Sequence, residues 1–252
     1  MSRSEPVEHL QNPATRFFEI KGDGYVYYYD KETKENVKVK PPFRFLVLDE
    51  VSQVGGGVKD RSGNYNGFWS NAVKDNNGIF TVRSGHNGNT RIEAEGTWAD
   101  IKGSLVGAKY VKGLYIGYYN DDKELSIGYL KLKGAGLSAW FEFNKDRRRI
   151  DVGAFTIKGR SDELTNGNTV YYEPVFEWTD KVRDETEEAA VALDVELQAY
   201  LKPYLAKGVV ETPTLEPLPE PEYSGVTDEN GLTNRDYAPV ETDEDDLDSI
   251  PF

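Results

Sequence analysis

The sequence lacks cysteine, and it has very little histidine and no long apolar run. Its 252 residues include two histidines, His9 and His86, and no cysteine. Without cysteine the chain cannot form disulfides, cysteine-ligated zinc sites or thiol nucleophiles. No stretch approaches the roughly 18–20 apolar residues that a membrane-spanning helix needs, and residues 1–10 contain no apolar signal-peptide core. These absences predict a protein that is neither membrane-bound nor secreted and that uses no metal or cofactor.

Acidic charge is concentrated in the last part of the chain. The sequence carries 30 Lys+Arg against 44 Asp+Glu, a net charge of −14. Residues 1–180 contain 25 residues of each sign, and residues 181–208 contain four basic and six acidic ones. Residues 209–252 contain 13 acidic residues and only Arg235 as a base. A net charge of −12 thus belongs to this last segment, and the neutral remainder is able to carry a basic face.

The acidic segment also differs in composition. Residues 209–223 contain four prolines among glutamates, a pattern typical of extended, solvated chain, because proline lacks a backbone donor and like charges repel. Residues 225–252 continue as polar, acidic chain. We therefore expect three parts, namely a folded domain at residues 1–180, a helix at residues 181–208 and a disordered acidic tail at residues 209–252.

Residues 1–180 have mainly the pattern of short β-strands. Runs of β-branched and aromatic residues alternate with segments rich in Gly, Asn and Asp, such as residues 55–57, 75–78 and 85–89, which we expect to be loops. The polar run at residues 30–36 predicts a turn, and Pro41–Pro42 predicts a bend or sheet edge because proline cannot donate to the ladder. We expect strands at residues 16–20, 24–30, 37–39, 43–51, 80–83, 90–95, 108–119, 125–132, 150–158 and 169–178.

Two segments have the pattern of helices. The longer one begins near Asp184, which can cap it together with Glu187, and its apolar residues recur at spacings of three and four. Acidic residues crowd its start and Lys202 lies near its end, as the helix dipole favours. Its single apolar stripe suits either packing on the domain or pairing with another subunit, so a homo-oligomer is possible. Residues 137–143 predict a short helix between two strands.

These elements predict a mainly β protein with an OB-fold-like five-stranded barrel, long loop insertions and a C-terminal helix. A β-sandwich also fits the strand pattern. No enzyme motif accompanies them: the residues after Gly55–Gly56–Gly57 lack the phosphate-binding Gly–Lys spacing, and Asp121–Asp122 has the pattern of a hairpin turn. His86 lies among Asn and Gly without a neighbouring ligand partner. We therefore predict no catalytic residues.

The last eight residues are Asp245–Asp246–Leu247–Asp248–Ser249–Ile250–Pro251–Phe252. An acidic run that ends in Ile–Pro–Phe resembles the C-terminal tip of bacterial single-stranded DNA-binding proteins. The resemblance covers only this end of the chain, and Leu247 and Ser249 depart from the family's run of aspartates. It implies an OB-fold that binds single strands and a disordered tail whose tip docks onto replication, recombination and repair enzymes. The long folded part and terminal helix look more like a phage-encoded relative, which implies the bacterial host cytoplasm as the location.

The physical chemistry of the tip is consistent with partner binding. Phe252 combines a large ring with the α-carboxylate, and Pro251 reduces the entropy lost on docking. A partner with an apolar pocket and a Lys or Arg at its rim suits such an end, and the acids steer encounter with basic surfaces. A role in solubility explains the acids but not the terminal Ile–Pro–Phe. The predicted partner-binding residues are Asp245, Asp246, Asp248, Ile250, Pro251 and Phe252.

Binding of single strands without sequence preference needs cations for phosphates and aromatic rings for bases. The chain contains 16 Tyr, 11 Phe and 4 Trp. By the strand period of two, Tyr25, Tyr27 and Tyr29 share one face, and lysines follow on the expected partner strand. Trp69 lies in a Gly/Asn-rich segment that we expect to be a loop. The predicted DNA-binding residues are Tyr25, Tyr27, Tyr29, Lys38, Lys40, Trp69, Trp98, Lys109, Tyr110, Lys112, Tyr115, Lys131, Lys133, Arg147, Arg148 and Arg149.

Each of these residues also has a structural interpretation. An aromatic residue in a strand more often fills the core, Trp98 fits either role, and Arg147–Arg148–Arg149 fits a solvated turn as well as a phosphate contact. Tyrosine is the better platform because its hydroxyl tolerates water. The phenylalanines that alternate with small or aliphatic neighbours we assign to the core, namely Phe43, Phe45, Phe141, Phe143 and Phe155.

The expected function is sequence-independent binding of single-stranded DNA, with recruitment of replication, recombination and repair enzymes through the tip. The acidic tail further predicts autoinhibition, because a segment of charge −12 competes with DNA for a basic groove. The alternative is a non-enzymatic β-domain that binds carbohydrate or serves a structural role. A third possibility, a tail that mimics DNA, leaves the folded domain without a purpose.

Overall fold

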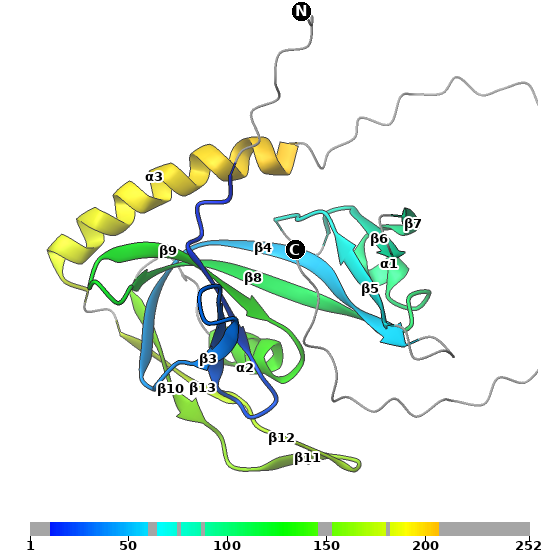
Figure 1. Ribbon diagram of the computed structural model, residues 1–252, viewed down its shortest axis with the longest axis horizontal. Coiled ribbons are helices and arrows are strands. Elements are labelled where there is room, and N and C mark those ends of the chain that lie inside the picture. The colour runs from blue at the N-terminus through cyan, green and yellow to red at the C-terminus, as the bar shows by residue number, and fades with distance from the viewer. Residues whose placement is uncertain are drawn as a thin grey trace, which may run out of the picture. The chain divides into compact units, whose positions relative to one another are not determined.

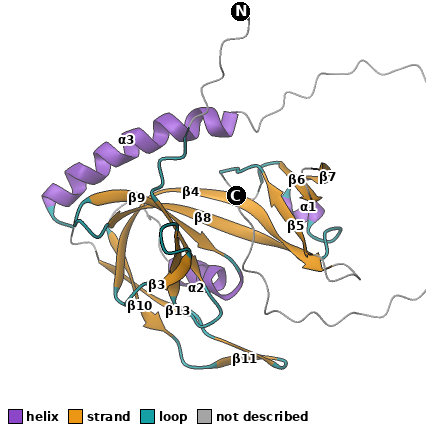
Figure 2. Cartoon of the chain, in the orientation of Figure 1, coloured by secondary structure: helices purple, strands orange, loops and turns teal. Residues whose placement is uncertain are grey.

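A continuous path of hydrogen-bonded strands dominates the computed structural model (Figures 1 and 2). The structure describes residues 11–59, 65–74, 77–86, 89–145, 153–179 and 182–206, all within the compact unit Met1–Gly208. The second unit, Val209–Phe252, lies outside the described residues, and with it the predicted tail. The strands are β1 (Arg16–Ile20), β2 (Val26–Asp30), β3 (Glu35–Lys38), β4 (Phe43–Lys59), β5 (Tyr65–Ser70), β6 (Phe80–His86), β7 (Asn89–Gly96), β8 (Ala108–Tyr119), β9 (Leu125–Leu132), β10 (Ala154–Arg160), β11 (Leu164–Asn166), β12 (Thr169–Tyr171) and β13 (Pro174–Thr179). The helices are α1 (Trp98–Ile101), α2 (Gly134–Asn144) and α3 (Asp184–Ala206).

The long strand β4 joins two parts of the sheet. The strand order is β3-β2-β1-β9-β8-β4-β5-β6-β7, and β10 pairs with both β4 and β13. The pairing of β1 with β9 is parallel and the other pairings are antiparallel. Strands β11 and β12 form a separate hairpin. The protein is therefore mainly β, as the sequence predicts, and no pairing among the described residues closes the sheet.

The strand predictions hold best where β-branched and aromatic residues run without interruption. Strands β8 and β9 cover the predicted residues 108–119 and 125–132. The predicted loop at residues 55–57 is wrong, because these glycines lie inside β4. Gly56 has φ +100°, and a Cβ there would lie 2.4 Å from the carbonyl oxygen of Gly107. Glycine here permits two backbones to approach closely within the sheet rather than forming a loop.

The main core lies between the sheet and α2. Leu114, Leu130 and Phe155 are fully buried in it, and Trp140 of α2 is 1% exposed. Helix α2 confirms the short helix predicted at residues 137–143, although it begins earlier. The side chains of β4, β8, β9 and β10 that pack into this core lie on one face of the sheet. The other face is available for other contacts.

The predicted core phenylalanines are right except at one position. Phe43, Phe45 and Phe155 are buried, and Phe143 packs against the same cluster. Phe141 is 50% exposed, so its assignment to the core was wrong. Alternation along the sequence placed it there, but residue 141 lies in a helix, where the residue after a buried Trp140 turns about 100° away from the core.

A second, smaller core lies within β5, β6 and β7. Phe68, Phe80 and Val82 are buried in it together with Ile101 of α1. The predicted loop around Trp69 is therefore wrong, because this segment is strand β5. The predicted loop at residues 85–89 is also shorter than expected, since β6 and β7 extend into it. In both segments the Gly and Asn content suggested loops, whereas their backbones pair in antiparallel ladders with neighbouring strands.

Helix α3 packs its apolar stripe on the outer face of the sheet, and Figure 1 shows it lying beside β9 and β4. Leu197 and Leu201 are fully buried against Tyr115 and Tyr129. The carbonyl of Arg183 accepts the first hydrogen bonds of the helix, from the N–H groups of residues 186 and 187. Arg183 therefore occupies the N-cap position, and the predicted cap at Asp184 is one residue late. None of the helices in the described ranges is long and apolar enough to cross a membrane.

Candidate nucleic-acid interface

Three tyrosines and three cations alternate where the β1–β2 turn, β3 and the β10–β13 connection meet. The Nζ of Lys38 lies 3.2 Å from the ring centroid of Tyr25 and 5.9 Å from that of Tyr27. The Nζ of Lys21 lies 5.1 Å from the ring of Tyr27. The guanidinium carbon of Arg160 lies 5.4 Å from the ring of Tyr25 and 3.8 Å from that of Tyr172. We call this set the tyrosine–cation ladder: Tyr25, Tyr27, Tyr172, Lys21, Lys38 and Arg160.

Sheet register explains half of the ladder. Tyr27 and Lys38 are paired residues on β2 and β3, so their side chains lie on the same face. Val26 is buried on the opposite face of β2, and Tyr28 packs there against the main core. The predicted shared face of Tyr25, Tyr27 and Tyr29 is thus confirmed.

Tight packing between two loops supplies the other half. The backbone N–H of Tyr172 donates to the carbonyl of Gly22 over 3.0 Å, which holds the β10–β13 connection against the β1–β2 turn. Between them lies Gly24 with φ +77°, where a Cβ would come within 2.8 Å of the Arg160 Cβ and 2.9 Å of the Tyr172 Cβ. Glycine at position 24 is therefore required for both its backbone angle and its space.

The ladder is net positive. Asp23 is its internal carboxylate, which lies 3.5 Å from the Lys38 Nζ and accepts a hydrogen bond of 2.7 Å from the Tyr27 hydroxyl. Desolvation, followed by this hydrogen bond, raises the pKa of Tyr27 to about 12. At its edge the Tyr172 hydroxyl donates to Glu163 over 3.2 Å. Three cations against two carboxylates leave an excess of positive charge at a surface with exposed Arg160 and Lys38.

Two further predicted residues continue this surface. Tyr29 lies two positions beyond Tyr27 on the same face of β2 and is 55% exposed. Lys40 follows β3 and is exposed. The structure therefore brings Tyr25, Tyr27, Tyr29 and Lys38 together with Lys40 nearby, as the sequence predicts.

Trp69 lies on a separate surface. It pairs with Arg83 across β5 and β6, and Arg83 pairs with Ile92 across β6 and β7, so the three side chains form a row on one face. Trp69 is 38% exposed and Ile92 is 57% exposed, while Phe68 and Val82 fill the opposite face. We call these three residues the Trp69 row. An exposed indole beside a guanidinium has the two elements that single-strand binding requires.

Three other predicted aromatics lie in the cores. Tyr115 is 3% exposed under α3, and burial raises its pKa. Tyr110 is held inside by its hydroxyl, which donates to Ser52 over 2.6 Å, and its ring lies 5.9 Å from that of Trp98. Trp98 is half-buried against the smaller core. Tyr115 is closed to a base, and Tyr110 and Trp98 are partly buried against the smaller core, so we leave the three out of the interface.

The predicted lysines of β8 and β9, and Lys133 directly after β9, differ in accessibility. Lys112 forms an ion pair of 3.1 Å with Glu50, and only 12% of its side chain is exposed. Lys133 lies 4.0 Å from Glu19. Burial lowers the pKa of Lys131, with a further contribution from Lys133. Lys109 is exposed at the start of β8, so it is the one of these four that is open to a phosphate.

The remaining predicted residues lie outside the described part of the chain. These are the basic run Arg147, Arg148 and Arg149 and the tip residues Asp245, Asp246, Asp248, Ile250, Pro251 and Phe252.

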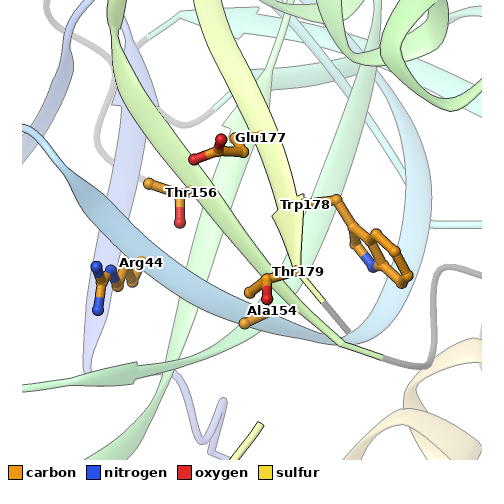
Figure 3. Close-up of a pocket in the computed structure, with 6 residues that line it drawn as sticks. All are labelled: Arg44, Ala154, Thr156, Glu177, Trp178 and Thr179. Atoms are coloured by element: carbon orange, nitrogen blue, oxygen red, sulfur yellow. The ribbon is translucent and has the colours of Figure 1, made fainter. Parts of the chain in front are cut away.

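A hollow of about 330 Å³ lies on β4, β10 and β13. Figure 3 shows the residues around it. It is lined by Arg44, Ala154, Thr156, Glu177, Trp178 and Thr179. The carboxylate of Glu177 is paired with Lys158 over 2.7 Å. Within the described ranges no three His, Asp or Glu side chains converge as metal ligands, and we assign the hollow no role.

The predicted DNA-binding residues do not include Lys21, Arg160 and Tyr172. No local pattern brings Arg160 to the β1–β2 turn, because it reaches the carbonyl of Asp23 across 137 residues of sequence. Lys21, by contrast, lies only six residues before Tyr27, and its place beside the tyrosine face could have been found from the sequence. Comparisons with protein-family models, with curated proteins and with solved structures give no match for this chain. The functional argument therefore depends on the chemistry of the two surfaces.

Proposed function

We propose that this protein binds single-stranded DNA without sequence preference, through the tyrosine–cation ladder and the Trp69 row. The ladder carries the proposal, because it places three tyrosine rings and three cations side by side at an accessible surface. Such a surface offers π-faces to any base and positive charge to any phosphate. Base–aromatic stacking contributes about 1–3 kcal/mol per base, so two or three platforms suffice for useful affinity.

The strand order supports an OB-like arrangement for this function. Strands β4, β8, β9, β10 and β13 occur in this order along the chain, with other strands inserted between them. In space they lie in the order β9-β8-β4-β10-β13. We propose that they correspond to the five strands of an OB-fold, a partly open Greek-key barrel. In that fold the loops between strands one and two and between strands four and five bind oligonucleotides. Here the corresponding connections contain the Trp69 row and Tyr172 of the ladder.

Helix α3 marks a departure from the usual OB-fold interface. The face of the second and third strands also binds oligonucleotides in that fold, but here α3 covers it with Leu197 and Leu201 against Tyr115. Burial of these two leucines stabilises the packing of α3 on the sheet by roughly 3–6 kcal/mol. DNA that bound this strand face would have to displace α3 and supply the same free energy through its bases. The proposed interface is therefore carried by the two connections, together with the β1–β3 segment against which Tyr172 packs, and not by the strand face.

We expect oligo-dT longer than the roughly 4–16 nucleotides of one OB-fold site to quench the intrinsic fluorescence of the protein. The signal should come mainly from Trp69, which is 38% exposed. Trp140 is 1% exposed, and Trp98 and Trp178 are partly buried against the two cores. The Trp69→Phe variant should bind with similar affinity but lose most of the tryptophan quenching. Affinity should fall with salt, with a slope of about 0.7 per phosphate contact in a log–log plot.

Two outcomes of this titration would contradict the proposal. One is no response to any oligonucleotide at low salt, together with a response to oligosaccharides, which would favour the carbohydrate-binding alternative. The other is quenching that salt leaves unchanged, because the cations of the ladder would then have no part in binding.

We also propose that the C-terminal tip recruits replication, recombination or repair enzymes. The support is the sequence itself, in which five acids precede Ile250–Pro251–Phe252 within the last ten residues. A synthetic peptide of residues 243–252 should bind a partner enzyme with an apolar pocket rimmed by Lys or Arg. The same peptide without Phe252 should not bind.

Deletion of residues 243–252 should tighten DNA binding by about three- to tenfold at low salt, because five negative charges that repel phosphates are removed. The gain should vanish near 0.5 M salt, where the screening length is only about 4 Å. A matched variant that lacks only Ile250–Pro251–Phe252 keeps these acids and should bind DNA like the full chain. The tail would have no electrostatic effect if both deletions gave the same affinity at every salt concentration.

A further inference from the structure

Cations of the same chain already cover the rings of the ladder. The Arg160 guanidinium carbon lies 3.8 Å from the Tyr172 ring centroid, which is stacking distance. Arg160 is exposed whereas Tyr172 is half-buried, so the guanidinium covers the ring from the solvent side. A nucleobase that stacks on Tyr172 from solvent must take the place of this guanidinium.

The Tyr172 ring is held by two hydrogen bonds, whereas the Arg160 guanidinium that covers it is held by one weak hydrogen bond. Tyr172 is fixed at both ends, by its backbone N–H on the carbonyl of Gly22 at 3.0 Å and by its hydroxyl on Glu163 at 3.2 Å. The Arg160 head group donates a long hydrogen bond of 3.5 Å to the carbonyl of Asp23, at the weak limit of such bonds. The platform is therefore preorganised, and its cover is easily displaced.

We propose that Tyr172 is a base-stacking platform and that Arg160 covers it in the free protein and moves to a phosphate when a nucleotide binds. This inference rests on the proposed function. Arginine suits both positions, because its planar guanidinium stacks on aromatic faces and its fork of donors matches a phosphate. The ligand of this site is thus an unpaired nucleotide, with its base on Tyr172 and its phosphate on Arg160.

A probe with a neutral backbone separates the two roles of Arg160. Phosphodiester oligo-dT and methylphosphonate oligo-dT present the same bases, but only the first offers charged phosphates. The Arg160→Ala variant should bind phosphodiester oligo-dT about fivefold more weakly, because it loses a phosphate contact. It should bind methylphosphonate oligo-dT about threefold more tightly, because the ring is uncovered. Tyr172→Leu should weaken both by about tenfold.

Lys40 provides the matched control. It is exposed, and no ring contact of Lys40 is found in the described part of the chain. Lys40→Ala should weaken only the phosphodiester complex. Arg160→Lys keeps the charge without the planar group, so it should retain phosphodiester affinity and still improve methylphosphonate binding. Thermal melting of each variant checks that the fold is intact.

The inference is overturned if Arg160→Ala and Arg160→Lys, both folded, leave methylphosphonate binding unchanged or weaken it. It is also overturned if Tyr172→Leu binds both probes like the wild type. Failure of the wild-type protein to bind phosphodiester oligo-dT is a different result, because it contradicts the proposed function itself.

Discussion

The Lys38→Glu variant should bind oligo-dT about 30- to 100-fold more weakly than the wild type at low salt. Lys38 is the central cation of the ladder, with its Nζ 3.2 Å from the Tyr25 ring and 3.5 Å from the Asp23 carboxylate. The substitution removes an attraction for phosphate of about 1 kcal/mol and adds a repulsion of similar size. Placing a second carboxylate beside Asp23 adds to that repulsion. The combined loss of roughly 2–3 kcal/mol corresponds to this fold-change, since a factor of ten is about 1.4 kcal/mol.

The control for this variant has to change the net charge by the same amount at a distant site. Lys202 is exposed on α3 and takes no part in the ladder. Lys202→Glu should weaken binding by less than about threefold, an effect that comes only from the overall field. Equal losses in the two variants, measured by fluorescence titration over a range of salt concentrations, would mean that net charge governs binding and that the ladder has no special role.

The salt dependence of the two variants gives a second, independent readout. Loss of one phosphate contact should lower the slope of log affinity against log salt by about 0.7 for Lys38→Glu. The slope for Lys202→Glu should stay near the wild-type value. An unchanged slope for Lys38→Glu with a large loss of affinity would instead indicate that the ladder has lost its shape.

The tyrosine face of β2 could be predicted from the sequence because a strand has a strict period of two. Tyr25, Tyr27 and Tyr29 had to share a face, and the pairing of Tyr27 with Lys38 followed from a hairpin with a short turn. Strands β8 and β9 could be predicted for a similar reason, since their β-branched and aromatic residues run without interruption. Local pattern thus determined which residues share a face.

The local sequence pattern could not determine which strand faces are buried under another element of the fold. Both faces of β8 are buried, with Leu114 in the main core and Tyr115 under α3. The sequence showed the apolar stripe of α3 but not the surface on which it lies, so Tyr115 was predicted to bind DNA. Arg160 and Tyr172 were missed from the ladder for a related reason. Their contacts with the β1–β2 turn depend on the tertiary path of the chain, which has no local signature.

Replacement of Trp140 by alanine should lower the free energy of unfolding by about 3–5 kcal/mol. Trp140 anchors α2 to the sheet: it is 1% exposed, and its ring lies 5.3 Å from that of Phe155 and 5.2 Å from that of Phe176. The substitution leaves a cavity among rings that themselves line the main core, so the surrounding side chains can relax only in part. Denaturant unfolding followed by circular dichroism measures the loss.

The neighbouring Phe141 offers a matched control on the same helix. It is also aromatic, but it is 50% exposed, so Phe141→Ala should cost less than about 1 kcal/mol. Should Trp140→Ala prove too unstable to measure, Trp140→Phe keeps a ring in the site and should lose about half as much stability. Similar losses at positions 140 and 141 would contradict the assignment of the buried face of α2. Since α2 connects β9 to β10, that result would also put in doubt the correspondence of these strands to an OB-fold.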